Sequence, residues 1–419
     1  METERRKPTL SPALALAAVA LALCAPAYAA PKYQVLHSFN GTDGSGPYGG
    51  VTFGPQGDLY GTTAGGGPCG TVFGLSPQKS DQWEEIVLYQ FGIDKDGCDP
   101  WSGVTFDPAG NLYGTTIGGG GGAYDSGTVF ELSPGSTGWT EKVLFAFDFN
   151  DGAKPVAGVA LDDSGNLYGT TPGGGIDSGG TTFELTPTSD GWSKKTLHNF
   201  HYAINGHPAP GGSTPYAAVI LDAAGNLYGT TTGGGVDCND GEGCGTVYEL
   251  TPTSGGGWKE VVLHRFHEHS KDGFIPGNGA LLMDSVGNLY GTTVAGGCCG
   301  GVVFKLTPNP DGHWTETILH AFQGGAGGDL PYAGVVMDTA GNLYGTTDGG
   351  GQASGCGVIY KLAPRAKGKW KYTVLYSFYG GVDGCVPAGN LVLDKKGNLY
   401  GGTILGGSSG NGVIFEITP

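Results

Sequence analysis

A short phrase, GNLYGTT at 110–116, recurs in near-identical form along the whole chain and constrains the fold more than any other feature. Its leucine stands at positions 59, 112, 167, 227, 289, 343 and 399, at spacings of 53, 55, 60, 62, 54 and 56 residues. Such a repeat is typical of architectures in which each unit buries its apolar face against its neighbours. The spacing is too long for one coil of a β-helix and fits a four-stranded propeller blade with its loops.

Each repeat contains four short runs rich in Val, Ile, Leu, Phe, Tyr and Thr, bounded by Gly, Pro or Asp, which predicts four β-strands. In the second repeat these runs are GVTF at 103–106, the phrase itself, GTVFEL at 127–132 and WTEKVLFAF at 139–147. No stretch has a sustained 3.6-residue period, so we expect almost no helix. The sequence therefore predicts an all-β fold, a seven-bladed β-propeller.

The two ends of the repeat region complete each other. QVLHSF at 34–39 has the pattern of a fourth strand with no third strand before it, and the chain ends at GVIFEITP, a third strand with no fourth. We therefore expect the N-terminal strand at 34–39 to complete the last blade and close the ring. Closure removes the free strand edges that promote aggregation.

Within the phrase, the residue types favour a structural role over a chemical one. Residues 107–110 should form a turn, which the side chain of Asn111 can stabilise. Leu112 and Tyr113 should point to opposite faces of the strand and pack towards different blades. Gly114 suits a place where another backbone comes close. A phosphate-binding loop would need a helix and usually a Lys after the glycines, and both are missing.

The combination of GNLYGTT–GGG, G-TVFELTP, the VL-x-x-F strand and DG-x-x-P resembles the GloVer tandem repeat of "choice-of-anchor" bacterial extracellular proteins. The segment P-x-x-GV-x-x-D-x-x-GNLY is also similar in register to NHL-type propeller repeats. The first resemblance covers nearly all of residues 34–419 and implies an exported, surface or extracellular protein. It implies no particular activity and no catalytic residues.

The first thirty residues have the pattern of a secretory signal peptide. Arg5, Arg6 and Lys7 precede an apolar run at 13–24, and Ala27-Tyr28-Ala29 forms a small-x-small cleavage site. We expect a signal peptide at 1–29 and a single propeller domain at 30–419, located outside the cytoplasm as a secreted, extracellular or periplasmic protein. No later segment is apolar and long enough to span a membrane.

The charge of the chain disfavours two kinds of partner, nucleic acids and anionic membranes. Its formal net charge is −17 and it has no run of Lys and Arg, so it lacks the electrostatic signature of binding to nucleic acid or to an anionic membrane. We expect a monomer whose partners are an extracellular polymer or another surface ligand.

Eight of the nine cysteines follow the expected signal peptide, an even number in an oxidising compartment. Two pairs are each 29 residues apart and occupy equivalent repeat positions, which predicts the disulfides Cys69–Cys98 and Cys356–Cys385. Cys238 and Cys244 should close one loop. For Cys298 and Cys299, a vicinal bridge and pairing elsewhere both stay open.

The fourth and fifth repeats have the longest spacings, and their loops carry candidate metal ligands. These residues are His201, His207, His267, His269, Asp237, Asp240 and Glu242. Calcium or another divalent metal would suit them, although solvated loop side chains explain the same pattern. The loop is not an EF-hand, because the twelfth residue from Asp237 is Tyr248.

Other polar positions recur with the repeat, and we interpret them as structural. His37, His198, His264 and His320 alternate with Tyr or Phe at one position of the fourth strand, and an Asp recurs before Gly in the following loop, at 43, 96, 151, 272 and 383.

Four aromatic residues, each directly after a loop proline, are candidate ligand-binding residues at the mouth of the central channel. They are Tyr48, Trp101, Tyr216 and Tyr332. Aromatic rings there can stack on sugar rings, and packing between blades is the alternative.

The leading hypothesis for function is a secreted, non-catalytic binding or scaffold propeller with a carbohydrate or another surface polymer as its ligand. The chain has no H-E-x-x-H motif and no convincing Ser/His/Asp set. The alternatives are an extracellular polysaccharide-acting enzyme with a metal-dependent site near blades 4 and 5, and a purely structural extracellular protein.

Overall fold

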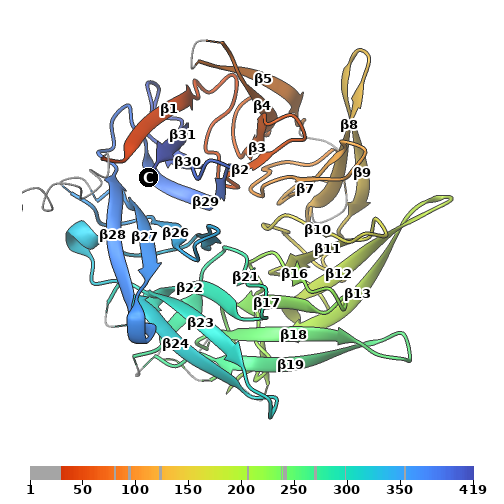
Figure 1. Cartoon of the computed structure of the whole chain (residues 1–419). Helices are drawn as coiled ribbons and strands as arrows, with labels where there is room; N and C mark the ends of the chain where they lie inside the picture. The colour runs from red at the N-terminus through yellow and green to blue at the C-terminus, as the bar shows by residue number, and fades with distance from the viewer. Residues whose placement is uncertain are drawn as a thin grey trace, which may run out of the picture.

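The computed structural model describes residues 30–419, except 80–81, 93–95, 122–124, 205–206, 237, 239–242, 269–270, 298 and 353–354. The expected signal peptide lies outside these residues. The described chain forms seven antiparallel sheets of four or five strands arranged in a ring (Figure 1). The structure is therefore the predicted all-β, seven-bladed propeller. No helix in the part that the structure describes is long and apolar enough to cross a membrane.

The strands of each blade follow one another from the axis outwards (Figure 1). Blades 1 to 3 consist of β2 (Val51–Phe53), β3 (Leu59–Thr63), β4 (Thr71–Pro77) and β5 (Trp83–Gln90); β6 (Thr105–Phe106), β7 (Leu112–Thr116), β8 (Thr128–Gly135) and β9 (Gly138–Ala146); and β10 (Ala160–Leu161), β11 (Leu167–Thr171), β12 (Ser178–Thr188) and β13 (Gly191–His201).

Blades 4 to 6 repeat this order. They consist of β16 (Ile220–Leu221), β17 (Leu227–Thr231), β18 (Thr246–Pro252) and β19 (Trp258–Arg265); β21 (Leu282–Met283), β22 (Leu289–Gly296), β23 (Val302–Pro308) and β24 (Trp314–Ala321); and β25 (Val336–Met337), β26 (Leu343–Thr347), β27 (Val358–Pro364) and β28 (Trp370–Ser377).

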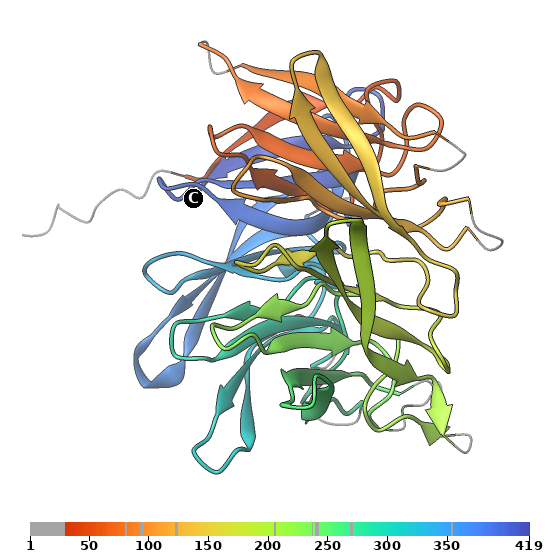
Figure 2. The same ribbon diagram turned by 90° about the vertical axis from the view of Figure 1, so that its right-hand side faces the viewer.

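Blade 7 is built from both ends of the chain. It contains β29 (Cys385–Leu393), β30 (Leu399–Leu405), β31 (Val413–Thr418) and, on the outside, β1 (Lys32–Ser38). β1 runs antiparallel to β31, with Lys32 opposite Thr418 and Ser38 opposite Val413. In both views the red N-terminal strand lies beside the blue C-terminal blade (Figures 1 and 2). The predicted closure of the ring by the N-terminal strand is confirmed.

The structure adds small elements that the repeat pattern did not predict. The hairpin β14 (Ala203–Ile204) and β15 (His207–Pro208) follows blade 3, and β20 (Gly273–Pro276) pairs with the extended end of β22. The helical elements among the described residues are the 3-10 turns η2 (Gly325–Gly327) and η3 (Ala366–Gly368). These additions lie in loops, where the repeats differ most.

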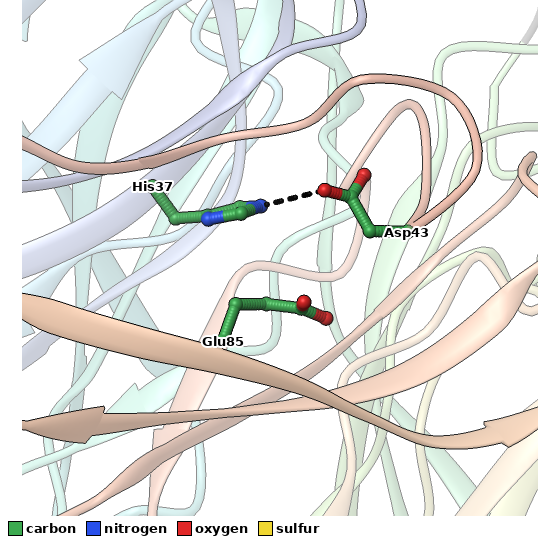
Figure 3. A group of neighbouring side chains, drawn as sticks. All are labelled: His37, Asp43 and Glu85. Atoms are coloured by element: carbon green, nitrogen blue, oxygen red, sulfur yellow. Dashed lines mark ion pairs between the residues drawn. The ribbon is translucent and has the colours of Figure 1, made fainter.

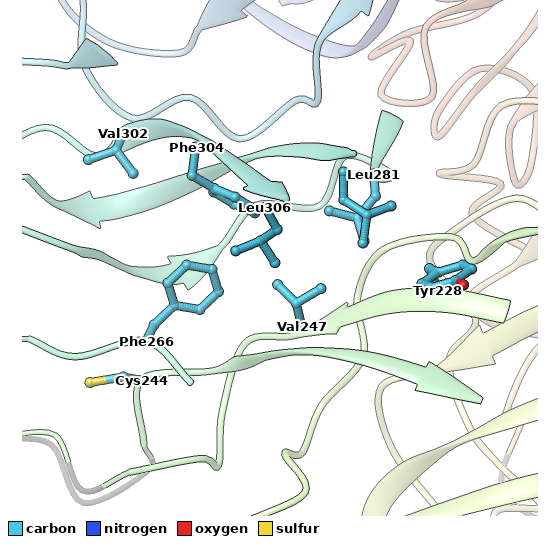
Figure 4. Close-up of a cluster of buried hydrophobic side chains, with 9 residues drawn as sticks. Tyr228, Cys244, Val247, Phe266, Leu281, Val302, Phe304 and Leu306 are labelled. Carbon is cyan, nitrogen blue, oxygen red and sulfur yellow. The ribbon is translucent and has the colours of Figure 1, made fainter. Parts of the chain in front are cut away.

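The hydrophobic core consists of seven separate clusters, each shared by two neighbouring blades. We call each interface a wedge and name it by its blades, so wedge 4–5 contains the cluster around Val247, Phe266 and Phe304 (Figure 4). Leu112 packs in wedge 1–2, and Tyr113 packs in wedge 2–3. The opposite orientation of these two residues is therefore as predicted.

The glycine of the phrase makes room for an aromatic ring. A Cβ built on Gly114 would lie 2.5 Å from Cζ of Phe130, a fully buried residue on the adjacent strand β8. The other six repeats place Phe or Tyr at the same position. The predicted close backbone neighbour is present at Gly61, where a Cβ would lie 2.7 Å from the Gly50 carbonyl oxygen, whereas the three nearest atoms at Gly114 belong to the Phe130 ring.

The polar residues of the phrase tie the strand to its surroundings. The Asp107 carboxylate accepts hydrogen bonds from the Asn111 backbone N–H at 2.8 Å and from the Tyr113 hydroxyl at 3.1 Å. The Thr115 hydroxyl donates to the carbonyl of Ala157 in blade 3 at 2.9 Å, while the Thr116 hydroxyl pairs with that of Thr128 at 2.8 Å. Each polar residue of the phrase therefore has a structural partner.

Candidate functional site

The entry to each blade near the axis is held by one residue with a left-handed backbone. The residue before the loop proline has a φ between 57° and 63° in every repeat. These residues are Gly46, Asp99, Lys154, Thr214, Ile275, Leu330 and Val386. Six are not glycine, and this conformation is a strained outlier for the β-branched ones.

Hydrogen bonds on both sides hold this residue in place. The Asp99 backbone N–H donates to the Cys69 carbonyl of blade 1 at 3.0 Å, and the Asp99 carbonyl accepts from the Ile117 backbone N–H of blade 2 at 3.1 Å. Leu330 makes the equivalent bonds to Gly300 and Asp348. The strained turn sets the direction of the proline and of the residue after it, which is the predicted aromatic position.

All four predicted aromatic residues line one cavity of about 320 Å³. Its lining comes from all seven blades, so the cavity lies on the axis of the ring. The small residues that follow the aromatic positions allow close backbone contact between inner strands. For example, a Cβ on Gly49 would collide with the Ser102–Gly103 backbone of blade 2. The cavity is of the size of a small ligand site.

The four aromatic rings differ in their surroundings. Tyr48 and Trp101 stack on each other, with ring centroids 4.5 Å apart and planes 4° from parallel. Trp101 is 39% exposed and Tyr332 is 38% exposed, and Tyr216 is half-buried. Packing between blades therefore accounts for part of the Tyr48 and Trp101 surface, and exposed ring surface remains at the cavity.

A half-buried carboxyl group in the same cavity was missed in the sequence. Asp348 follows β26 at a position that holds Ala64, Ile117, Pro172, Thr232, Val294 and Ile404 in the other repeats. Its Oδ1 atom is buried and has no hydrogen-bond partner, and burial raises the pKa of Asp348 to about 7. Burial, with a smaller contribution from Asp348, also raises the pKa of Tyr332. The signal in the sequence was a charged residue at a position that is uncharged in the other six repeats.

The Asp348→Asn variant should change the pH dependence of stability. The pKa of Asp348 is raised in the folded state from 3.8 to about 7, so the folded protein holds this proton more tightly than the unfolded chain does. Its contribution to stability is complete below about pH 4 and is lost as the pH rises through about 7. Urea unfolding from pH 4 to pH 8 should show a smaller loss of stability in Asp348→Asn than in the wild type. Parallel curves would contradict this expectation.

The structure contains the three disulfides that the spacing predicts. Cys69–Cys98 joins blade 1 to the segment that enters blade 2, and Cys356–Cys385 makes the equivalent link between blades 6 and 7. The third disulfide, Cys238–Cys244, closes a loop of blade 4. Cys299 is exposed, and its neighbour Cys298 lies outside the described residues.

The predicted metal ligands in the loops of the fourth and fifth repeats lie in different surroundings. His201 ends β13 and forms an ion pair with Asp177 at 2.6 Å, with both side chains about half exposed. His207 lies in β15, and His267 follows β19, where its backbone N–H donates to Asp272 at 3.2 Å. The other four predicted ligands, Asp237, Asp240, Glu242 and His269, lie outside the described residues. A metal site in these loops stays a prediction.

The structure brings together histidines and loop aspartates that sequence reasoning treated separately. In wedge 7–1, His37 on β1 lies 3.3 Å from Asp43, and Glu85 on β5 lies beside them (Figure 3). Burial lowers the pKa of His37, against the opposing effect of Asp43. Burial and then Asp43 raise the pKa of Glu85 to about 7.

Wedge 4–5 holds an equivalent group. His264 on β19 lies 3.2 Å from Asp272 and 3.7 Å from Glu316 on β24. Burial, and then Asp272, raises the pKa of Glu316. The recurrence of His, Asp and Glu in three different runs was visible in the sequence. Only the fold shows that the three runs meet between blades.

Comparison with family models gives one match, the Gloeobacter/Verrucomicrobia repeat, at residues 27–239, 121–324 and 299–419. The chain belongs to the Gloeobacter/Verrucomicrobia repeat family. Each match spans more than one blade, and together the matches cover residues 27–419, which include all seven blades. No curated protein matches the sequence.

Solved structures similar to this family member are distant in sequence. A gluconolactonase from Xanthomonas campestris is 14% identical, with 70% of this chain and 81% of that chain covered and a TM-score of 0.39. A putative oxidoreductase (glucose dehydrogenase) from Thermus thermophilus is 12% identical, with 93% and 100% covered and a TM-score of 0.43. PorZ, a surface component of the type-IX secretion system of Porphyromonas gingivalis, is 15% identical, with 82% and 43% covered and a TM-score of 0.45.

Proposed function

We propose that this protein is a secreted, non-catalytic binding propeller that takes a neutral carbohydrate segment at the mouth of its channel. The observation that carries the proposal is the convergence of four aromatic rings from four blades, together with Asp348, on one axial cavity. Aromatic faces suit the apolar faces of sugar rings, and a half-buried carboxyl group can bind a sugar hydroxyl.

The charge of the site supports a neutral ligand over an anionic one. The cavity lining contains Asp348 and no Lys or Arg among the described residues. The whole chain carries a formal net charge of −17. Both features disfavour an acidic polysaccharide, because like charges repel the ligand before it reaches the cavity.

Secretion is part of the proposal and is supported by three disulfides and by the signal-peptide pattern at 1–29. Stable disulfides are typical of compartments outside the cytoplasm.

The test is a panel of neutral and acidic polysaccharides with the chain from Ala30 onwards, scoring retention and released product together. We expect retention of a neutral polymer without product. Trp101→Ala and Tyr332→Ala should each weaken binding by roughly 10-fold or more, since loss of an aromatic anchor costs over about 1.4 kcal/mol. Tyr379→Ala, which removes a 58% exposed ring outside the cavity lining, is the matched control and should bind normally.

Two results would contradict the proposal. Product release that a chelator abolishes would establish a metal-dependent enzyme. Equal binding by the wild type, Trp101→Ala and Tyr332→Ala would move the ligand away from the channel mouth.

A further inference from the structure

The seven wedges provide an internal comparison at one structural position. Each wedge places a residue of one fourth strand, a residue of the loop that follows it and a residue of the next blade's fourth strand close together. From wedge 7–1 to wedge 6–7 the sets are His37/Asp43/Glu85, Tyr89/Asp96/Glu141, Phe145/Asp151/Lys194, His198/Gly211/Glu260, His264/Asp272/Glu316, His320/Gly327/Tyr372 and Tyr376/Asp383/Tyr33.

In three wedges the residues at these positions contact one another directly, without an ion between them. In wedge 2–3 the Lys194 ammonium donates to the Asp151 carbonyl at 2.6 Å. In wedge 5–6, His320 stacks on Tyr372 with ring centroids 4.0 Å apart. In wedge 6–7 the Tyr376 hydroxyl donates to Asp383 at 3.0 Å, and Tyr376 stacks on the ring at the third position.

Two further wedges have part of a ligand set. In wedge 1–2 a tyrosine replaces the histidine, and the Tyr89 hydroxyl donates to Asp96 at 2.8 Å. In wedge 3–4 the aspartate is missing, and His198 lies 3.8 Å from Glu260. Neither wedge combines an imidazole with two carboxylates.

Wedges 7–1 and 4–5 alone among the seven combine His, Asp and Glu. In each, one nitrogen and two carboxylate oxygens lie within 4.8 Å of one another. The glutamate at this position has one buried carboxylate oxygen without a hydrogen-bond partner in both wedges, at Glu85 and Glu316, as Glu141 and Glu260 also do in wedges 1–2 and 3–4. An unpartnered buried carboxylate oxygen is costly, and only in wedges 7–1 and 4–5 do an imidazole and a second carboxylate lie beside it to complete a set of metal ligands.

We propose that His37/Asp43/Glu85 and His264/Asp272/Glu316 are two binding sites for a divalent transition metal of the zinc class, each joining adjacent blades. Ligand atoms on a tetrahedral zinc at about 2.0–2.1 Å lie about 3.3–3.4 Å apart. The distances of 3.2 and 3.7 Å from His264 Nε2 to the two carboxylates are close to this value. The imidazole favours zinc over calcium, which prefers oxygen ligands only.

Three protein ligands leave a fourth position for a water molecule. The His264 side chain is 18% exposed, Asp272 is 8% exposed and Glu316 is 16% exposed, so the site is reachable from solvent and still mostly enclosed. The site in wedge 7–1 includes β1, the strand that closes the ring. Metal binding there would hold the closing strand to blade 1 as well as to β31.

The test measures zinc stoichiometry of the untagged chain from Ala30 onwards by equilibrium dialysis with metal analysis. We expect two zinc ions per chain, one in His264→Tyr, one in His37→Tyr and none in the double variant. Tyrosine is the native residue at this position in wedges 1–2 and 6–7, so the fold should accept it. Affinity at an altered site should fall roughly 100-fold or more, because even outer-shell changes cost about 10–100-fold.

Three further variants distinguish loss of a metal ligand from loss of the fold. Glu85→Gln and Glu316→Gln preserve shape and should also remove one zinc each. His198→Tyr changes the same strand position in a wedge that lacks the aspartate, and it should still bind two zinc ions. Zinc should raise the unfolding temperature of the wild type and not that of His37→Tyr/His264→Tyr, and calcium should not compete.

The proposal is overturned if the wild type binds no zinc, or if the double variant keeps both ions. Zinc that is lost in His201→Ala and kept in His37→Tyr/His264→Tyr would instead place the metal in the loops near blades 4 and 5.

Discussion

A chain that starts at Asn40, and so lacks β1, is expected to lose the folded monomer. Removal of β1 leaves β31 as an open strand edge and takes Leu36 and Phe39 out of wedge 7–1. Phe39 is fully buried and packs edge-to-face on Phe73 with ring centroids 5.1 Å apart. Loss of two such side chains costs about 5–10 kcal/mol, which is comparable to the whole stability of a typical domain. Size-exclusion chromatography and circular dichroism would detect aggregation and loss of native structure.

A circular permutant gives the matched control for this truncation. Lys32 lies opposite Thr418, so residues 30–39 can follow Pro419 through a two-glycine linker without a long connection. The new chain would begin at the exposed Asn40. We expect this permutant to be a folded monomer, because it restores the strand without restoring the original chain order. A folded monomer from the truncated chain, or failure of the permutant, would show that strand closure is not what holds the ring.

Replacement of Phe130 by Ala should lower the free energy of unfolding by about 3–5 kcal/mol, the usual cost of deleting a fully buried ring. Phe130 is 0% exposed and contributes to wedge 1–2 with Phe91, whose ring centroid lies 5.1 Å away. Gly114→Ala should cost about 1–3 kcal/mol, because the new methyl group would overlap the Phe130 ring. Chemical denaturation of each variant measures both values.

The double variant Gly114→Ala/Phe130→Ala distinguishes this explanation from a general effect of glycine replacement. The methyl group at position 114 would enter the space that the ring leaves. The loss of stability in the double variant should therefore be smaller than the sum of the two single losses, by at least about 0.5 kcal/mol. Gly255→Ala is the control, since a Cβ at Gly255 meets no atom within 4 Å, and its effect should stay within about 0.5 kcal/mol. Strict additivity of the first two costs would contradict the proposed overlap.

The repeat made the fold predictable because each structural requirement occurs seven times in the sequence. Leu112 and Tyr113 alternate along one strand, and alternation alone assigns them to opposite wedges. The closing strand was predictable because the first and last repeats are incomplete in complementary ways. By contrast, the hydroxyl of Thr115 bonds to Ala157 in the next blade, and strand propensity contains no information about that partner.

The candidate sites were predictable only in part, and the reason is again the repeat. The aromatic residues after the loop proline share one position near the axis, so their convergence followed from the fold. Asp348 comes from a different strand end, and His264, Asp272 and Glu316 come from three segments of two blades. Recurrence made His264 and Asp272 resemble core and turn residues, whereas their chemistry depends on which wedges also hold a glutamate beside them.

The division of the core into seven shared clusters affects how the molecule can open. Every blade contributes to two clusters, and closure by β1 leaves no blade with a single neighbour. An open array of repeats can fray from its ends, one unit at a time. Here the opening of any one blade breaks two of the seven clusters and exposes the apolar faces of two neighbours, whereas the end unit of an open array breaks only one interface, so no blade of the ring can open as readily as a terminal repeat.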